Sequence, residues 1–273
     1  MKTWLITGAS SGLGRLMSED LLARGDCVLA CVRRTEAMAD LQGQYGEQLQ
    51  VITLDLANTA SIAPAIGKAF AQVESVDVVV SNAAYGLFGA AEELSDAQID
   101  RQIATNLTGS IQLIRAVIPL LRQQGGGRIA QVSSEGGQVA YPNFSLYHAS
   151  KWGIEGFVEA VRQEVANFGI DFLLVEPGPT ATNFGAGLDI AEAQDVYRDT
   201  ASGEVRRAIM SGEFAIKGDA AKSVTAMIAT LDQPAMPLRL ALGSTAYDNI
   251  EAALERRLAE LRSQKEIAYR ADV

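Results

Sequence analysis

The sequence predicts an α/β fold in which a doubly wound parallel sheet of about seven strands carries helices on both faces. Three observations lead to this class. Short runs rich in Val, Ile and Leu alternate with longer amphipathic segments along the chain. The short runs are continuously apolar, as expected for strands that are buried on both faces. The first run is followed by a glycine-rich turn and a helical pattern, an order typical of doubly wound sheets.

The candidate strands are short, β-rich and bounded by turn residues. Cys27 and Cys31 lie in the second of them, and an extended chain holds residues at this spacing too far apart for a disulfide. We therefore expect two free thiols that pack as small apolar side chains. The candidate strands are Thr3–Thr7, Cys27–Val32, Gln50–Leu54, Val76–Val80, Arg128–Ser133, Ile170–Val175 and Pro237–Leu242.

The candidate helices carry recognisable start and stop signals. Ser95 and Gln98 form a capping box, and Asp219 can cap a helix over Ala220–Leu231. Periodic apolar residues predict further helices over Leu13–Arg24, from Asn106 to Gly125, over Ile154–Phe168 with a stop at Gly169, and over Thr245–Lys265.

No internal repeat, low-complexity tract or linker divides the chain, so we expect residues 1–273 to form a single domain. Residues 179–217 carry mixed helix and turn signals, and an insertion of this kind is typical of a substrate lid. Residues 245–273 are charged and helical in pattern, which predicts a C-terminal helical extension.

The charge and the histidine count exclude several classes of function. The formal net charge of −10, from 33 acidic and 23 basic residues, argues against nucleic acid as a ligand. The one histidine, His148, leaves no multi-histidine metal site and argues against a Ser-His-Asp hydrolase, so no metal is expected. His148 follows Tyr147 directly and would point about 100° away from it on a helix, so we interpret it as a packing or surface residue.

No apolar run approaches the length of about 20 residues that a membrane-spanning helix requires. The segment before Gly8 is too short for a signal peptide. We therefore expect a cytoplasmic protein without a membrane span.

Tyr147 and Lys151 stand four residues apart, a spacing that places them on one face of a helix. A phenol ordinarily titrates near about 10. A positive charge beside it favours the phenolate, so the pair can serve as an acid and base near neutral pH.

A glycine-rich turn follows the first strand and opens the first helix. Such a turn lets the backbone approach a pyrophosphate and directs helix N–H groups toward it. The spacing is G-x-x-x-G-x-G rather than the common G-x-G-x-x-G. A turn that binds nothing is the alternative. The residues expected to hold a dinucleotide here are Gly8, Ser10, Ser11, Gly12, Leu13 and Gly14.

Together with Ser134, which lies thirteen residues before Tyr147, these motifs resemble the classical short-chain dehydrogenase/reductase family. The resemblance covers at least Lys2 to Thr182 and implies a single Rossmann-like dinucleotide-binding catalytic domain. Ser133 is the weaker candidate for the catalytic serine. Ser81 and Ala84 depart from the Asn and Gly of the family's motif after the fourth strand, and the methyl group of Ala84 could either crowd the cofactor or be tolerated. The resemblance assigns further cofactor contacts to Asp55, Leu56, Asn82, Ala83, Ala84, Tyr147, Lys151, Pro177, Gly178, Thr180 and Thr182.

The end of the second strand bears on the choice of cofactor. An acid there would bind the ribose hydroxyls of NAD, whereas a base would accept the additional phosphate of NADP. Val32 takes the position of the acid, and Arg33 and Arg34 follow it. This pattern is similar to NADP-dependent family members, so we expect NADP(H). The alternative is that both arginines are ordinary solvated charges.

The resemblance implies an NADP(H)-dependent oxidoreductase that interconverts a ketone or aldehyde and the corresponding alcohol by hydride transfer. Tyr147 would donate the proton, Lys151 would hold the ribose and lower the pKa of Tyr147, and Ser134 would stabilise the alkoxide. Asn106 would support a water chain. A non-catalytic NADP(H)-binding sensor, or a lyase or epimerase on the same scaffold, is the alternative.

Apolar residues near the expected site predict a small hydrophobic carbonyl or alcohol substrate, although such residues can equally be core packing. Trp152, Gly153 and Gly156 on the helix after Lys151 could allow subunit packing, in a homodimer or homotetramer as is frequent in the family. The charged stretch from Glu251 to Lys265 could instead be a solvated helix. The expected substrate walls are Tyr85, Leu87, Phe88, Val139, Tyr141, Phe144, Leu146 and Phe184.

Overall fold

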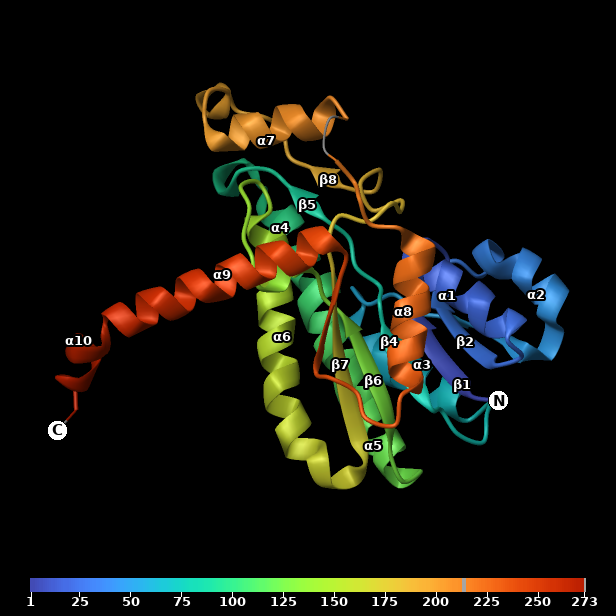
Figure 1. Cartoon of the computed structure of the whole chain (residues 1–273). Helices are drawn as coiled ribbons and strands as arrows, with labels where there is room; N and C mark the ends of the chain where they lie inside the picture. The colour runs from blue at the N-terminus through green and yellow to red at the C-terminus, as the bar shows by residue number, and fades with distance from the viewer. Residues whose placement is uncertain (213–214, 273) are drawn as a thin grey trace.

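A computed structural model describes residues 1–212 and 215–272 and shows a parallel sheet of seven strands in the order β3-β2-β1-β4-β6-β7-β9 (Figure 1). All neighbouring pairs in it are parallel, so the predicted doubly wound sheet is confirmed. The first two strands match their predicted bounds, and the others differ by one or two residues. The strands are β1 (Thr3–Thr7), β2 (Cys27–Val32), β3 (Leu49–Thr53), β4 (Val78–Ser81), β6 (Gly127–Val132), β7 (Ile170–Pro177) and β9 (Arg239–Leu242).

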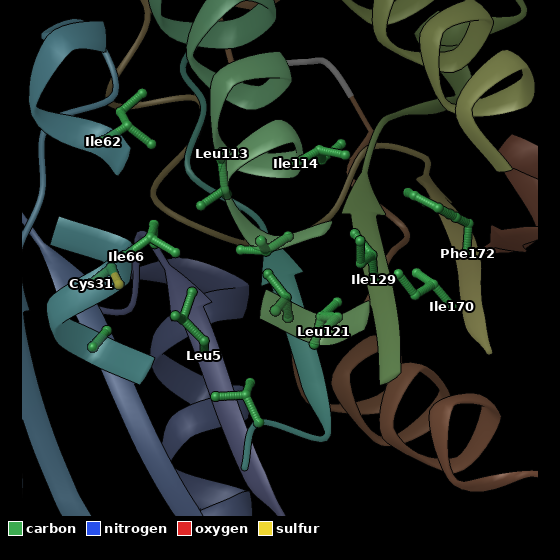
Figure 2. Close-up of a cluster of buried hydrophobic side chains, with 14 of the residues drawn as sticks. Leu5, Cys31, Ile62, Ile66, Leu113, Ile114, Leu121, Ile129, Ile170 and Phe172 are labelled. Carbon is green, nitrogen blue, oxygen red and sulfur yellow. The ribbon is translucent and has the colours of Figure 1, made fainter. Parts of the chain in front are cut away.

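Successive side chains of a strand enter two different cores, one on each face of the sheet. In β1, Leu5 joins one core, whereas Trp4 and Ile6 join the other. This explains why the strand sequences are continuously apolar. The first core, shown in Figure 2, is closed by α3 (Thr59–Phe70), α5 (Ser110–Gln123) and α6 (Ser145–Val165). The second is closed by α1 (Gly12–Ala23), α2 (Ala39–Tyr45) and α8 (Ala220–Asp232).

Both predicted helix caps are confirmed. Gln98 N donates to Ser95 Oγ at 3.4 Å at the start of α4 (Asp96–Ile103), and Ser95 N donates back to Gln98 Oε1 at 3.1 Å. At the start of α8, Lys222 N donates to Asp219 Oδ1 at 2.9 Å. The helix expected from Asn106 begins instead as a π-helical turn, η4 (Ala104–Gly109), that passes into α5.

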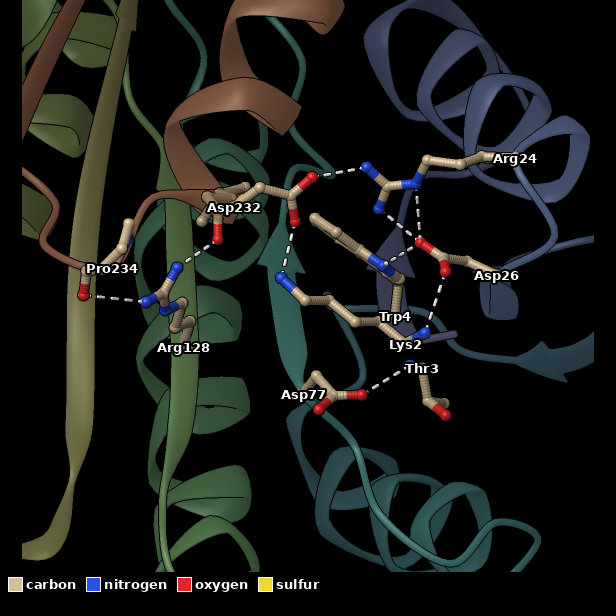
Figure 3. Close-up of polar contacts among 10 residues, drawn as sticks. Lys2, Thr3, Trp4, Arg24, Asp26, Asp77, Arg128, Asp232 and Pro234 are labelled. Carbon is tan, nitrogen blue, oxygen red and sulfur yellow. Dashed lines mark hydrogen bonds and ion pairs between the residues drawn. The ribbon is translucent and has the colours of Figure 1, made fainter.

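The N-terminal ends of the strands are closed by an ion-pair network (Figure 3). Asp232 at the end of α8 accepts from Lys2 Nζ at 2.6 Å and from Arg24 Nη1 at 2.5 Å. Arg24 also pairs with Asp26, whose Oδ2 accepts from Trp4 Nε1 at 3.1 Å. These contacts join α1, α8 and β1 at the edge of the sheet opposite the carboxyl ends of the strands. In doubly wound folds, ligands bind at those carboxyl ends.

Residues 179–217, apart from positions 213 and 214, which lie outside the described residues, are placed beyond the carboxyl ends of the strands (Figure 1). They contain β8 (Asp189–Ile190), the short η7 (Asp195–Tyr197) and α7 (Ala201–Met210). β8 pairs in parallel with β5 (Leu87–Phe88). Together the two strands form a small second sheet that the sequence did not predict.

The C-terminal extension forms α9 (Ser244–Ser263) and α10 (Lys265–Tyr269), and residue 273 lies outside the described part of the chain. The first part of α9 lies against the body of the protein, and its far end projects away from the sheet (Figure 1). Within the described residues, no helix combines the length and apolar character needed to cross a membrane. Cys27 and Cys31 are free thiols, as predicted.

Candidate active site

The glycine-rich turn between β1 and α1 is shaped by its glycines. Gly8 and Gly12 have φ values of +67° and +54°, in the left-handed region that favours glycine. Gly14 serves a different purpose, because a Cβ there would lie 2.5 Å from Gly8 O and 2.6 Å from Asn82 Nδ2. The third glycine therefore allows α1 to approach the turn closely.

The same turn is fastened to the end of β4 by Thr7 and Asn82. The hydroxyl of Thr7 accepts from the backbone N–H of Asn82 at 2.9 Å and of Ala83 at 3.1 Å. Asn82 Nδ2 donates to Thr7 O at 2.9 Å. Two motifs that lie far apart in the sequence thus form one rigid floor. Ala84 is exposed on the cavity beside this floor.

One continuous cavity of about 1020 Å³ runs along the carboxyl ends of the strands. Its volume lies at the upper end of the range of about 300–1,000 Å³ that is typical of ligand pockets. Among the residues predicted to be catalytic or cofactor-binding, three are absent from its wall: Gly14, Arg34 and Asn106. The others line it, namely Gly8, Ser10, Ser11, Gly12, Leu13, Arg33, Asp55, Leu56, Asn82, Ala83, Ala84, Ser134, Tyr147, Lys151, Pro177, Gly178, Thr180 and Thr182.

Ser134 is hydrogen-bonded to the phenol of Tyr147. Its hydroxyl also accepts from Gly136 N at 3.0 Å, where it caps η5 (Glu135–Gly137). The neighbouring Ser133 instead donates to Glu155 Oε1 at 2.5 Å. The geometry therefore separates the two serines of the pair, because the hydroxyl of Ser133 is held by a buried carboxylate.

Lys151 is buried, with 2% of its surface exposed, and its Nζ donates to Val132 O at 3.0 Å. The same atom lies 5.6 Å from the centre of the Tyr147 ring. Burial lowers the pKa of Lys151 to about 8, and the negative charge of Glu155 opposes this shift.

The pKa of Tyr147 differs from the sequence-based expectation. Burial raises it to about 12, although the hydrogen bond with Ser134 acts in the opposite direction, and the negative charge of Glu135 adds to the rise. The expected net lowering of this pKa was wrong, because desolvation of the phenolate outweighs any effect of Lys151. At neutral pH Tyr147 is consequently a protonated donor.

Asn106 is buried in the π-helical turn and is bonded to the backbone of Tyr85. Its Nδ2 donates to Tyr85 O at 2.8 Å, and its Oδ1 accepts from Tyr85 N at 3.2 Å. The side chain therefore holds the loop after β4, and it does not reach the cavity wall.

His148 is a packing residue, and the surface alternative was wrong. The residue is 6% exposed, with Nδ1 2.9 Å from Gly136 O and Nε2 accepting from Tyr141 N at 2.9 Å. This pattern fixes the tautomer with the proton on Nδ1. Burial lowers the pKa of His148, so the ring is neutral at physiological pH.

The substrate end of the cavity contains half of the predicted walls. Tyr85, Tyr141, Phe144 and Phe184 line it. The prediction was wrong for Leu87 and Phe88, which are 1% and 0% exposed and serve as core, and Val139 and Leu146 are also absent from the wall. Sequence reasoning did not identify five further residues of the segment 179–217 whose side chains line the cavity. These are Asn183, Leu188, Asp189, Ile209 and Ile216.

Arg33 is exposed at the rim of the cavity, directly after Val32, which is 2% exposed. It forms no ion pair with another side chain of the described ranges. The neighbouring Arg34 is also exposed but lies outside the cavity.

The cavity fits a nicotinamide dinucleotide. Gly8 and Gly12 leave no side chain between the turn and an incoming pyrophosphate, and the N-terminus of α1 begins at that point. Arg33 and Asp55 lie on the wall at one end, and Ser134, Tyr147 and Lys151 lie on it at the other.

A glycine turn and a Ser-Tyr-Lys group in one cavity, at the carboxyl edge of a doubly wound sheet, define a dinucleotide-binding oxidoreductase. The chain belongs to the short-chain dehydrogenase family, because residues 2–193 match the model described as short chain dehydrogenase. Two solved structures with the same fold, at TM-scores of 0.73 and 0.72 and identities of 24% and 23%, are a short chain dehydrogenase from Burkholderia cenocepacia in complex with NADP and a 3-ketoacyl-(acyl-carrier-protein) reductase from Brucella melitensis complexed with NADH.

Individual relatives agree with this assignment. The chain is 34% identical to oxidoreductase BOA17 from Botryotinia fuckeliana over 258 residues, 93% of each protein. It is 31% identical to a 3-ketodihydrosphingosine reductase from Bacteroides thetaiotaomicron over 202 residues, 74% of this chain and 72% of that protein. The crystal structure of a short-chain dehydrogenase from Streptomyces avermitilis superposes with a TM-score of 0.90 at 37% identity, covering 99% of this chain and 98% of that one.

Proposed function

We propose that this protein is an NADP(H)-dependent oxidoreductase that interconverts a hydrophobic ketone or aldehyde and the corresponding alcohol. The observation that carries the proposal is the composition of one cavity. It joins the glycine turn and Arg33 at one end to Ser134, Tyr147 and Lys151 at the other. A cavity of this kind can hold a dinucleotide and place a carbonyl against an acid.

The cofactor would supply the hydride, and the side chains would control the proton and the developing charge. Tyr147, protonated at neutral pH, would donate its phenolic proton to the carbonyl oxygen. Ser134 would hydrogen-bond to the same oxygen as it gains negative charge. Lys151 would bind ribose hydroxyls and favour the phenolate left behind.

The family resemblance implies that Asn106 supports a water chain, but the side chain of Asn106 would have a different role. Both polar atoms of its side chain are bonded to the backbone of Tyr85. It would therefore keep Tyr85 in the substrate wall, and any proton relay through it would use main-chain atoms of the π-helical turn.

The substrate class follows from the character of the cavity wall. The rings of Phe144 and Phe184 lie 6.1 Å and 5.5 Å from that of Tyr147, and Leu188 adds apolar surface to the same cavity. Residues 179–217 would act as the lid over a hydrophobic carbonyl compound. The name of the Bacteroides relative, a reductase of a keto compound, supports reduction as the reaction.

Replacing Arg33 with Asp is expected to weaken NADPH binding and to shift preference toward NADH. The acid would repel the ribose phosphate of NADP and could accept hydroxyl hydrogen bonds from NAD. Titration of each cofactor, followed by its fluorescence, measures both dissociation constants. Arg34→Asp is the matched control, because it makes the same charge change outside the cavity. Equal NADPH affinity in the wild type and Arg33→Asp would remove Arg33 from this role.

We also propose that the protein acts in the cytoplasm as a homodimer or homotetramer. On α6, Trp152 is already contacted by Arg257 of α9, at 5.0 Å from the ring centre, while Gly156 faces open space. On the projecting part of α9, Leu254, Leu258 and Leu261 are 48%, 45% and 65% exposed at helical spacing. A second subunit would cover this stripe.

Leu258→Glu is therefore expected to lower the oligomeric state measured by sedimentation equilibrium. A charge placed in an apolar interface loses hydration without gaining a partner. Met210→Glu is the matched control, because Met210 is an exposed apolar residue on the lid, 53% exposed. A wild-type protein that sediments as a monomer would contradict the proposal.

A further inference from the structure

The chain between Ser134 and Tyr147 forms one wall of the cavity, and it is held from two sides. It contributes Glu135, Gly136, Tyr141 and Phe144 to that wall. Since η5 is its longest regular element, the segment depends on contacts with neighbouring helices for its shape.

The first support comes from α6, the helix that carries the catalytic pair. His148 bridges Gly136 O and Tyr141 N, each at 2.9 Å, and so closes the segment into a loop. Because His148 directly follows Tyr147, this support is part of the catalytic helix.

The second support comes from α9, more than a hundred residues later in the chain. Asn249 Nδ2 donates to Glu135 Oε2 at 3.2 Å and to the hydroxyl of Tyr141 at 2.9 Å. Further along α9, Arg257 Nη1 donates to Gln138 O at 2.9 Å. One side-chain amide thus bridges two residues of the cavity wall.

The bridge from Asn249 matters for the reaction because it holds Glu135, a buried acid close to the catalytic residues. Its carboxyl group is next in sequence to Ser134, is 5% exposed and forms no ion pair within the described ranges. The groups that face it are the Asn249 amide and the hydroxyl of Tyr141. A buried carboxylate without such donors pays a large desolvation cost and would reorient toward solvent. Its negative charge also acts on Tyr147, so its position affects the proton donor.

We infer that Asn249 is a positioning residue that holds Glu135 and Tyr141 in the cavity wall, which makes α9 a structural part of the active site. Only the expected effect of Asn249 on substrate binding rests on the proposed function. The amide group suits this task because its two N–H donors can serve both acceptors at once.

The test compares Asn249→Ala with Tyr247→Phe by hydrogen–deuterium exchange of the peptides that cover residues 135–143. Tyr247 is the matched control, because its hydroxyl bonds only to the exposed Glu251 of the same helix, at 3.1 Å, among the contacts of the described chain. Loss of the bridge should speed exchange in these peptides by about tenfold, as expected for local opening, while the strands of the sheet keep their protection. Asn249→Gln, which restores an amide, should recover part of the protection.

Steady-state kinetics give a second readout. Asn249→Ala should raise KM for a hydrophobic ketone by about tenfold, the loss expected for a misplaced wall, with the Kd for NADPH unchanged. Unchanged exchange in residues 135–143 would overturn the inference, as would faster exchange spread evenly over the whole protein. If the wild type reduces no ketone, the proposed function fails, and the exchange result still decides the role of Asn249.

Discussion

Replacing Tyr147 with Phe is expected to slow carbonyl reduction by about 10²- to 10⁴-fold, the usual contribution of a positioned proton donor. The substitution removes the phenolic oxygen and keeps the ring, so contacts with Phe144, Phe184 and His148 persist. NADPH should bind the variant as it binds the wild type, because the glycine turn and Arg33 are untouched.

Single-turnover reduction of a ketone by enzyme saturated with NADPH measures the effect directly. Tyr85→Phe is the control, because Tyr85 is another cavity tyrosine whose hydroxyl accepts from Arg101 Nε at 3.4 Å. A Tyr147→Phe variant that turns over at the wild-type rate would overturn the assignment of the proton donor. Loss of NADPH binding would instead indicate that the phenol serves the cofactor.

Replacing Ser134 with Ala is expected to lower kcat by about 10²- to 10³-fold, the loss seen when one oxyanion donor is removed. In this variant Tyr147 also loses its hydrogen bond with Ser134. In the wild type that bond opposes the rise in the pKa of Tyr147. The variant's pKa for Tyr147 should therefore be higher than that of the wild type. In the oxidative direction, which requires the phenolate, the pH–rate profile should move to higher pH.

The adjacent serine provides the comparison. Ser133→Ala removes a donor from the buried carboxylate of Glu155, which leaves an acceptor less well satisfied and should cost about 1–3 kcal/mol of stability. Its effect should appear in thermal unfolding, and that of Ser134→Ala in kcat. Equal losses of kcat in the two variants would contradict the separation of their roles.

The sheet could be predicted from the sequence because its signals are local and strong. Continuous apolar runs, the Ser95 and Asp219 caps and the glycine turn each depend on a few neighbouring residues. The motifs that line the cavity were likewise predicted because parallel strands bring their carboxyl ends to one edge.

The remaining features depend on packing between distant segments, which the sequence pattern does not carry. Leu87 and Phe88 look like pocket walls, but their pairing with β8 buries them. The pKa of Tyr147 depends on the depth of burial, and a helical spacing of four residues says nothing about that depth. The bridge from Asn249 to Glu135 joins residues 114 positions apart.

The alternation of side chains in β1 has a consequence for how sequences of this fold can diverge. Leu5 faces one core, and Trp4 and Ile6 face the other, so a substitution in a strand disturbs one core and leaves its counterpart intact. Inserting a single residue in β1 would move every side chain beyond it to the opposite face of the sheet. The packing of both cores would then be disrupted at once. Lineages that keep this sheet can therefore accumulate replacements within strands, while gains and losses of residues are confined to loops.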